Sequence, residues 1–155
     1  MSGCPSVTDS DVKTYLLICN IHFQYFRGLN EFLIHLIFLK EKGVTIALMT
    51  NDTQPGVEEF IFRNKLEGFF DYFWSAENKP SKPKPEAVIE LCKTMNLNPS
   101  ECALISDADT DLRMAKKADI QIVVGFNGGW KTPPTLNEKR FLIEKLNELK
   151  IHSSH

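Results

Sequence analysis

The sequence lacks the features that mark several large classes of protein. Its 155 residues contain no hydrophobic run long enough to cross a bilayer, because charged or polar residues interrupt each apolar stretch. The formal net charge is only −2, from 18 basic and 20 acidic side chains, so no overall charge favours nucleic acid or an anionic membrane. Internal repeats and low-complexity segments are also absent. We expect one domain over residues 1–155, with flexible ends at about 1–12 and 150–155.

Metal-binding patterns of cysteine and histidine are missing as well. The four cysteines, Cys4, Cys19, Cys92 and Cys102, form no Cys-x-x-Cys pair and no histidine cluster accompanies them, so a zinc site is not expected. The N-terminal residues show no basic segment followed by an apolar core, which a secretory signal would need. Together these observations favour free thiols in a reducing compartment, and we expect a cytoplasmic location.

What the sequence does contain is an alternation of helical and strand-like patterns. Apolar residues recur at helical spacing in several segments, and short, nearly continuous apolar runs lie between them. Such alternation predicts an α/β fold: a three-layer, Rossmann-like parallel sheet with helices on both faces. The expected helices are 30–42, 54–64, one opening at Pro85, 112–118 and a last one through Leu142, Ile143, Leu146 and Leu149; the expected strands are 44–49, 69–75, 103–106 and 121–125.

Three groups of polar residues lie at the ends of expected strands or in the loops that follow them. In folds of this class, ligands bind at the carboxyl ends of the strands. Thr50 follows the run 44–49, where a hydroxyl and backbone amides suit an anion, although, taken alone, a cap on the next helix by Thr50 or Asp52 explains this stretch better. Lys82 lies in the proline-rich stretch KPSKPKPE. Asp107, Asp109 and Asp111 come within five residues after the strand 103–106. Crowded carboxylates repel one another unless a cation binds, and a hard cation such as Mg²⁺ prefers oxygen ligands.

The order of these motifs resembles that of the haloacid dehalogenase (HAD) superfamily of phosphohydrolases. The matching stretches are ALMTND, KPKPEAV and ISDADTDLRMA, with GVEEFIFRNKLEGFFDYFWSAE and NLNPSECALI between them. The resemblance spans roughly residues 28–130. It implies that Thr50 binds a phosphoryl group, with backbone contact from Asn51, and that Lys82 is the phosphate lysine. Lys84 fits the family context less well.

The acidic motif has an implied role of its own. By resemblance, Asp107 is a Mg²⁺ ligand, and Asp111 is the second acid, which orients the lysine or lies behind the metal. Ser106 stands where the family usually has glycine.

The gaps after residues 20 and 50 hold no cap domain, so the implied substrate is a phosphorylated small molecule or an exposed phosphate on a macromolecule. Oligomerisation stays possible.

The family's Asp-x-Asp motif, which supplies a nucleophile and an acid–base group, does not follow any apolar run of this chain. Segment 15–21 is such a run, and it would place Asn20 at the nucleophile position and His22 at the acid–base position. Asparagine has no anionic oxygen with which to form an acyl phosphate. Asp9 and Asp11 have the right spacing, but no strand-like run precedes them.

The same segment also fits a helix, because apolar residues recur at 12, 16, 19, 23 and 26. It would then be the last helix of a lost cap. We favour the strand, because the family's first strand lies in the middle of the sheet. An empty place there would leave backbone groups of the neighbouring strands without hydrogen-bond partners.

Three functions follow from these alternatives: a weak or inactive Mg²⁺-dependent phosphate-monoester hydrolase, a catalytically silent phosphate- and metal-binding or regulatory module, or an N-terminally truncated phosphatase. A response-regulator receiver shares the architecture, but there the acidic residues precede the threonine and the lysine. Here Thr50 and Lys82 come first.

Overall fold

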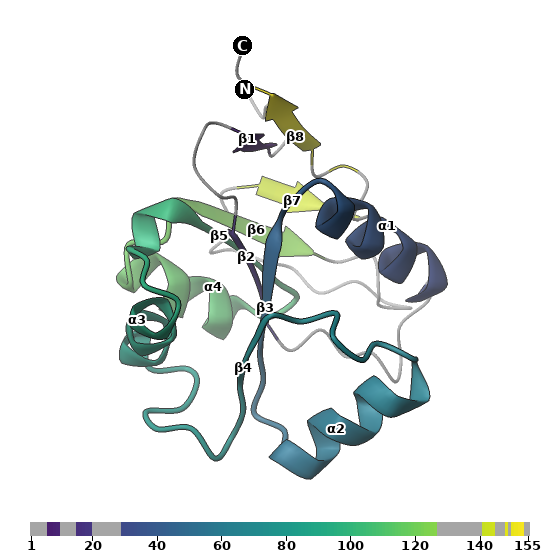
Figure 1. The fold of residues 1–155 in the computed structure, drawn as a ribbon. Helices are drawn as coiled ribbons and strands as arrows, with labels where there is room; N and C mark the ends of the chain where they lie inside the picture. Colours follow the sequence, from purple (N-terminus) through teal and green to yellow (C-terminus); the bar gives the residue numbers. More distant parts are fainter. Residues whose placement is uncertain are drawn as a thin grey trace.

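The computed structural model describes residues 6–9, 15–19, 29–126, 141–144, 148 and 150–153. Asn20 and His22, the candidate nucleophile and acid–base residues, lie outside these ranges, as does Asp11. The centre of the molecule is a six-stranded sheet in which every pair of neighbours is parallel (Figure 1). In spatial order its strands are β4 (Tyr72–Trp74), β3 (Thr45–Met49), β2 (Tyr15–Cys19), β5 (Cys102–Ser106), β6 (Ile122–Phe126) and β7 (Phe141–Ile143).

Strand β2 occupies the middle of this sheet, between β3 and β5. Cys19, its last residue, pairs with Met49 of β3 on one side and with Ser106 of β5 on the other. The strand interpretation of Tyr15–Cys19 is therefore confirmed, and the helical alternative is wrong for these residues. Parallel pairing on both edges of β2 satisfies the backbone groups on the facing edges of β3 and β5, which a missing strand would have left without partners inside the sheet.

Helices cover both faces of the sheet, as predicted. Helices α1 (Leu29–Glu41) and α2 (Gln54–Arg63) lie on one face, and α3 (Pro85–Thr94) and α4 (Asp109–Lys117) lie on the other (Figure 1). Residues of β2 alternate between the two cores: Ile18 packs with α1 and α2, whereas Leu17 and Cys19 pack with α3 and α4. Among the described residues, no helix has the length and apolarity needed to cross a membrane.

The helix starts follow local chemistry. Thr53 caps α2, since its hydroxyl accepts a hydrogen bond from the backbone N–H of Gly56 at 3.2 Å. Proline opens α3 at a position where no backbone donor is needed. Helix α4 begins at Asp109, three residues before its expected start, so Asp109 and Asp111 both lie in its first turn. Carboxylates there interact favourably with the helix dipole.

Two expectations about the chain ends were wrong. Leu142 and Ile143 belong to strand β7 and not to a helix, because backbone pairing with β6 prevails over a helix-like spacing of apolar residues. Asp9 does end a strand, because β1 (Ser6–Asp9) pairs with β8 (Lys150–Ser153). Elsewhere in the chain, a 3-10 turn, η2 (Pro99–Glu101), precedes β5. Strands β1 and β8 form a separate two-stranded sheet, so Asp9 does not end a strand of the central one.

Candidate functional site

The candidate site lies at the carboxyl edge of the central strands. Cys19 pairs with both Met49 and Ser106. The next residues in the chain after these three are Asn20, Thr50 and Asp107. Parallel strands end at the same edge of a sheet, so Thr50 and Asp107 flank the end of β2 on its two sides.

Thr50 is held in place by hydrogen bonds of its backbone and its side chain. Its N–H donates to the carbonyl of Trp74 at 2.8 Å, which extends the pairing of β3 and β4 by one residue. Its Oγ1 accepts a hydrogen bond from the backbone N–H of Asp52 at 3.0 Å. Thr50 is buried, whereas the neighbouring Asn51 is exposed. The turn therefore fixes the Thr50 hydroxyl close to the start of α2.

Lys82 and Asp111 form a buried ion pair. The Lys82 Nζ lies 3.0 Å from Asp111 Oδ2, and the two side chains are only 2% and 5% exposed. The Ser106 hydroxyl donates to the same Oδ2 at 2.8 Å. The fold thus brings the loop between β4 and α3 against the first turn of α4, and it places the lysine beside the acidic motif.

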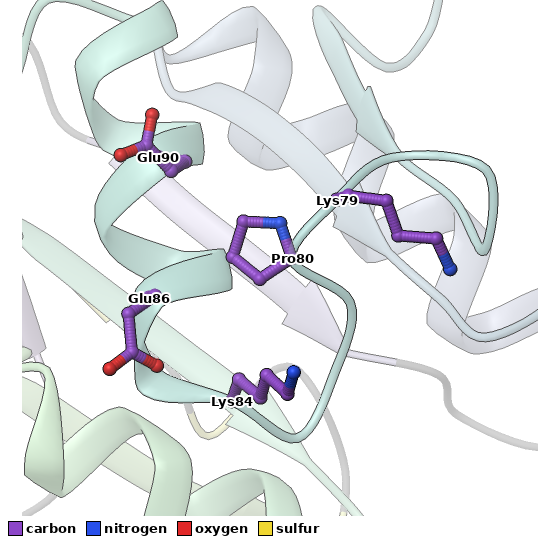
Figure 2. A pocket seen from close by; sticks show the side chains of 5 residues that line it. All are labelled: Lys79, Pro80, Lys84, Glu86 and Glu90. Carbon is purple, nitrogen blue, oxygen red and sulfur yellow. The ribbon is translucent and has the colours of Figure 1, made fainter.

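The other lysines of the proline-rich loop have a different environment. Lys79 and Lys84 are exposed, and with Pro80, Glu86 and Glu90 they line an open hollow of about 650 Å³ at the foot of α3 (Figure 2). The two glutamates balance the two lysines there, so the hollow has no charge excess. Of the lysines in this loop, only Lys82 contacts the acidic motif in the described structure.

Trp74 and Ser75 anchor the loop that carries Lys82. The Trp74 indole Nε1–H donates to the carbonyl of Pro80 at 2.8 Å. The Ser75 N–H donates to Asn78 Oδ1, also at 2.8 Å. Sequence reasoning missed these roles, because an aromatic strand followed by a polar loop has no distinctive spacing. The two bonds fix the loop only a few residues before Lys82.

Glu77 joins the same loop to α2. Its Oε2 accepts hydrogen bonds from the Ser75 hydroxyl at 3.0 Å and from the backbone N–H of Gln54 at 2.8 Å. The Ser75 bond holds the pKa of Glu77 below its ordinary value. A lowered pKa means that the bonded carboxylate contributes stability at neutral pH, and that this contribution is lost as the pH falls through the carboxyl range.

Cys19 shows that the charged residues converge on the end of β2. Burial raises the pKa of its thiol, Lys82 opposes that shift, and Asp111 and Asp107 add to it. All three charges therefore act on one side chain at the end of the central strand. A raised pKa favours the protonated thiol at neutral pH, which is the less nucleophilic form of cysteine.

Asp107 is the described residue that best suits a metal ion. It follows β5 and is only 4% exposed, whereas the Oδ2 of Asp111 already accepts bonds from Lys82 and Ser106. No three His, Cys, Asp or Glu side chains gather into a metal cluster within the described ranges. Mg²⁺ commonly keeps several waters and binds through one or two carboxylates together with a substrate phosphate. The donor chemistry at Asp107 fits that mode.

Comparison with known proteins agrees with this architecture. The family model described as "haloacid dehalogenase-like hydrolase" matches residues 8–124, a range that includes Asn20 and His22. Phosphoglycolate phosphatase of Pseudomonas putida is 29% identical over 98 residues, which are 61% of this chain and 36% of that protein. Phosphoglycolate phosphatase 1 of Pseudomonas aeruginosa is 27% identical over 74% of this chain and 43% of its own length.

A third relative, the phosphorylated carbohydrates phosphatase of Thermotoga maritima, is 28% identical over 70% of this chain and 48% of its own length. The chain thus spans between about a third and a half of the curated relatives it matches. These relatives share the family of this chain, and their activities belong to longer proteins.

Solved structures share the fold. A HAD-superfamily hydrolase of subfamily IA from Geobacter sulfurreducens superposes with a TM-score of 0.66 at 13% identity, covering 86% of this chain and 96% of that one. A predicted phosphoglycolate phosphatase of Haemophilus somnus also gives 0.66, at 22% identity, over 77% of this chain and 53% of that one. The family match over residues 8–124 and the shared sheet lead to one conclusion: this chain belongs to the haloacid dehalogenase-like hydrolase family.

Proposed function

We propose that this chain carries a phosphate-monoester site that uses Mg²⁺, and that its hydrolytic activity is weak or absent because Asn20 occupies the nucleophile position. The observation that carries the proposal is the register of β2 with its neighbours. Cys19 aligns with Met49 and Ser106, and the next residues in the chain after these three are Asn20, Thr50 and Asp107. An active relative needs an aspartate there.

The chemistry of the described residues supports phosphate binding. In the proposed complex, the Thr50 hydroxyl and the Lys82 ammonium contact the phosphoryl oxygens, and the buried contact with Asp111 keeps the ammonium in position. Asp107 would hold Mg²⁺, which supplies positive charge beside the phosphoryl group when it is bound. Each of these groups can bind a phosphate ester without cleaving it.

Cleavage requires a nucleophile that this chain does not offer at the expected position. In the family reaction a carboxylate oxygen forms a bond to phosphorus, the bond from phosphorus to the ester oxygen breaks, and an acid protonates the leaving group. The Asn20 amide oxygen carries no full negative charge. His22 is at the acid–base position of the motif and could donate a proton to a leaving group. Without a nucleophile at position 20, however, no leaving group is displaced.

The proposed ligand is a phosphorylated small molecule or an exposed phosphate on a macromolecule. Only residues 20–28 separate β2 from α1, and α2 begins four residues after Thr50. Neither gap is long enough for a substrate-covering domain. The names of the relatives make phosphoglycolate and sugar phosphates the first small molecules to test. We also propose that the protein works in the cytoplasm.

Calorimetric titration with inorganic phosphate, with and without Mg²⁺, tests the proposed site. We expect Thr50→Val to weaken phosphate binding by about tenfold, because it removes one hydroxyl contact to a charged ligand. Asp107→Asn should abolish the gain in phosphate affinity that Mg²⁺ gives the unmodified chain. Thr94→Val is the matched control, since Thr94 is exposed and its hydroxyl donates to the Glu90 carbonyl within α3. Equal phosphate affinity in Thr50→Val and Thr94→Val would refute the proposed site.

A further inference from the structure

We propose that Ser106 is a positioning residue of this site, whose hydroxyl holds Asp111 against Lys82 and so sets the place of the phosphate-binding ammonium. The inference rests on the proposed function and adds a residue to it. Ser106 stands where the resemblance leads one to expect glycine, which has no side chain to play such a part. The hydroxyl is therefore a feature of this chain that the family pattern does not require.

The geometry ties Ser106 to both halves of the acidic motif. Its Oγ donates to Asp111 Oδ2 at 2.8 Å and accepts a hydrogen bond from the backbone N–H of Ala108 at 3.2 Å. The same Oδ2 receives Lys82 Nζ at 3.0 Å. One oxygen of Asp111 thus receives both donors, and the Ser106 hydroxyl links it to the turn that carries Asp107.

Burial makes these bonds matter. Ser106 is fully buried, and Asp111 and Lys82 are nearly so, so water cannot easily replace a missing donor. Without the hydroxyl, the Ala108 N–H would lose its acceptor and Asp111 Oδ2 would keep only the lysine. An ion pair held by one contact on a rotatable carboxyl group has more freedom than one held by two. Removing an outer partner of this kind commonly weakens the function of the group it supports.

The position of Ser106 in the sheet explains why its effect would reach the ligand. It is the last residue of β5 and pairs with Cys19 at the end of β2 and with Gly125 of β6. Its backbone is therefore fixed on both sides, and its side chain is a rigid point from which Asp111 is oriented. Asp107 follows directly in the chain.

Phosphate affinity of the Ser106→Ala variant tests the inference, measured by calorimetry with inorganic phosphate and Mg²⁺. We expect binding about tenfold weaker than in the unmodified chain, the low end of the effect of losing an outer partner. Cys102→Ala is the matched control: it removes one buried side-chain atom from the other end of the same strand, and we expect unchanged affinity. Ser106→Gly, the residue usual in the family, serves as a second variant that should fold and bind as weakly as Ser106→Ala.

A double-mutant cycle separates positioning from a general loosening of the fold. If Ser106 acts through Asp111, then Ser106→Ala should change phosphate affinity little in the Asp111→Asn background, and the two effects will not add. Independent, additive losses would overturn the inference, as would unchanged or tighter binding in Ser106→Ala and Ser106→Gly. An unmodified chain that binds no phosphate would instead overturn the proposed function itself, so the two failures are distinguishable.

Discussion

Replacing Asn20 by aspartate is expected to raise Mg²⁺-dependent hydrolysis of p-nitrophenyl phosphate by at least about 10³-fold, a modest share of the loss seen when an enzyme nucleophile is removed. The change replaces the side-chain amide NH2 group by a carboxylate oxygen of almost equal size. It supplies the anionic oxygen that forms an acyl phosphate, at the residue that follows Cys19 in the chain. Release of p-nitrophenol, followed by absorbance, measures the effect.

Two controls isolate the role of that carboxylate. Asn20→Asp combined with Asp107→Asn should fall back to the rate of the unmodified chain, because the proposed metal ligand is then missing. Asn98→Asp makes the same chemical change at an exposed residue before the amino end of β5, and it should leave hydrolysis unchanged. If Asn20→Asp has no effect while the unmodified chain binds phosphate, Asn20 does not occupy the nucleophile position.

Lys82→Met is expected to reduce the free energy of unfolding by about 3–5 kcal/mol, as removing one partner of a buried ion pair commonly does. The Asp111 carboxylate, 5% exposed, would keep the Ser106 hydroxyl as a donor but lose its cation. The variant should also bind phosphate far more weakly, because the ammonium contact disappears with the side chain. Urea unfolding gives the first quantity and calorimetry with inorganic phosphate gives the second.

The neighbouring Lys84 provides the comparison. Lys84→Met makes the same substitution two residues later, at an exposed position, and should change stability by less than about 0.5 kcal/mol. The double variant Lys82→Met/Asp111→Leu should recover part of the lost stability, because no unpaired charge then remains inside. Lys82→Met and Lys84→Met of equal stability would contradict the assignment of a buried, charged pair.

The central strands could be predicted because their sequences leave few alternatives. The apolar runs that became β3 and β5 are too short for helices and too continuous for a half-exposed strand, so a covered parallel sheet was the natural expectation. For Tyr15–Cys19, periodicity fitted a strand and a helix about equally. The sheet itself decided between them, because β3 and β5 leave a place between them that needs a strand.

The chain ends could not be predicted, because their pairing partners lie far away in the sequence. Strand β1 pairs with β8, and β7 extends the edge of β6. Leu142 and Ile143 have a helix-like spacing with later leucines, and nothing local indicates that backbone pairing with β6 would prevail. Short strands of this kind depend on tertiary contacts more than on their own preference.

The candidate site also contains residues that the sequence could predict and one whose role it could not. The motif order pointed to Thr50, Lys82 and Asp107, and the fold places Lys82 against Asp111 in the acidic motif. The part played by Ser106 could not be foreseen, because it depends on where one hydroxyl points within a turn. A glycine-to-serine departure in a motif indicates only that something differs there.

The most direct test of the account is one ³¹P NMR experiment on the unmodified chain with Mg²⁺ and a phosphate monoester. It reports binding and turnover in the same sample. We predict that the ester signal shifts or broadens as protein is added, while inorganic phosphate forms at least about 10³-fold more slowly than with Asn20→Asp. Rapid formation of inorganic phosphate by the unmodified chain, lost in Asp107→Asn, would contradict the claim that Asn20 silences this site.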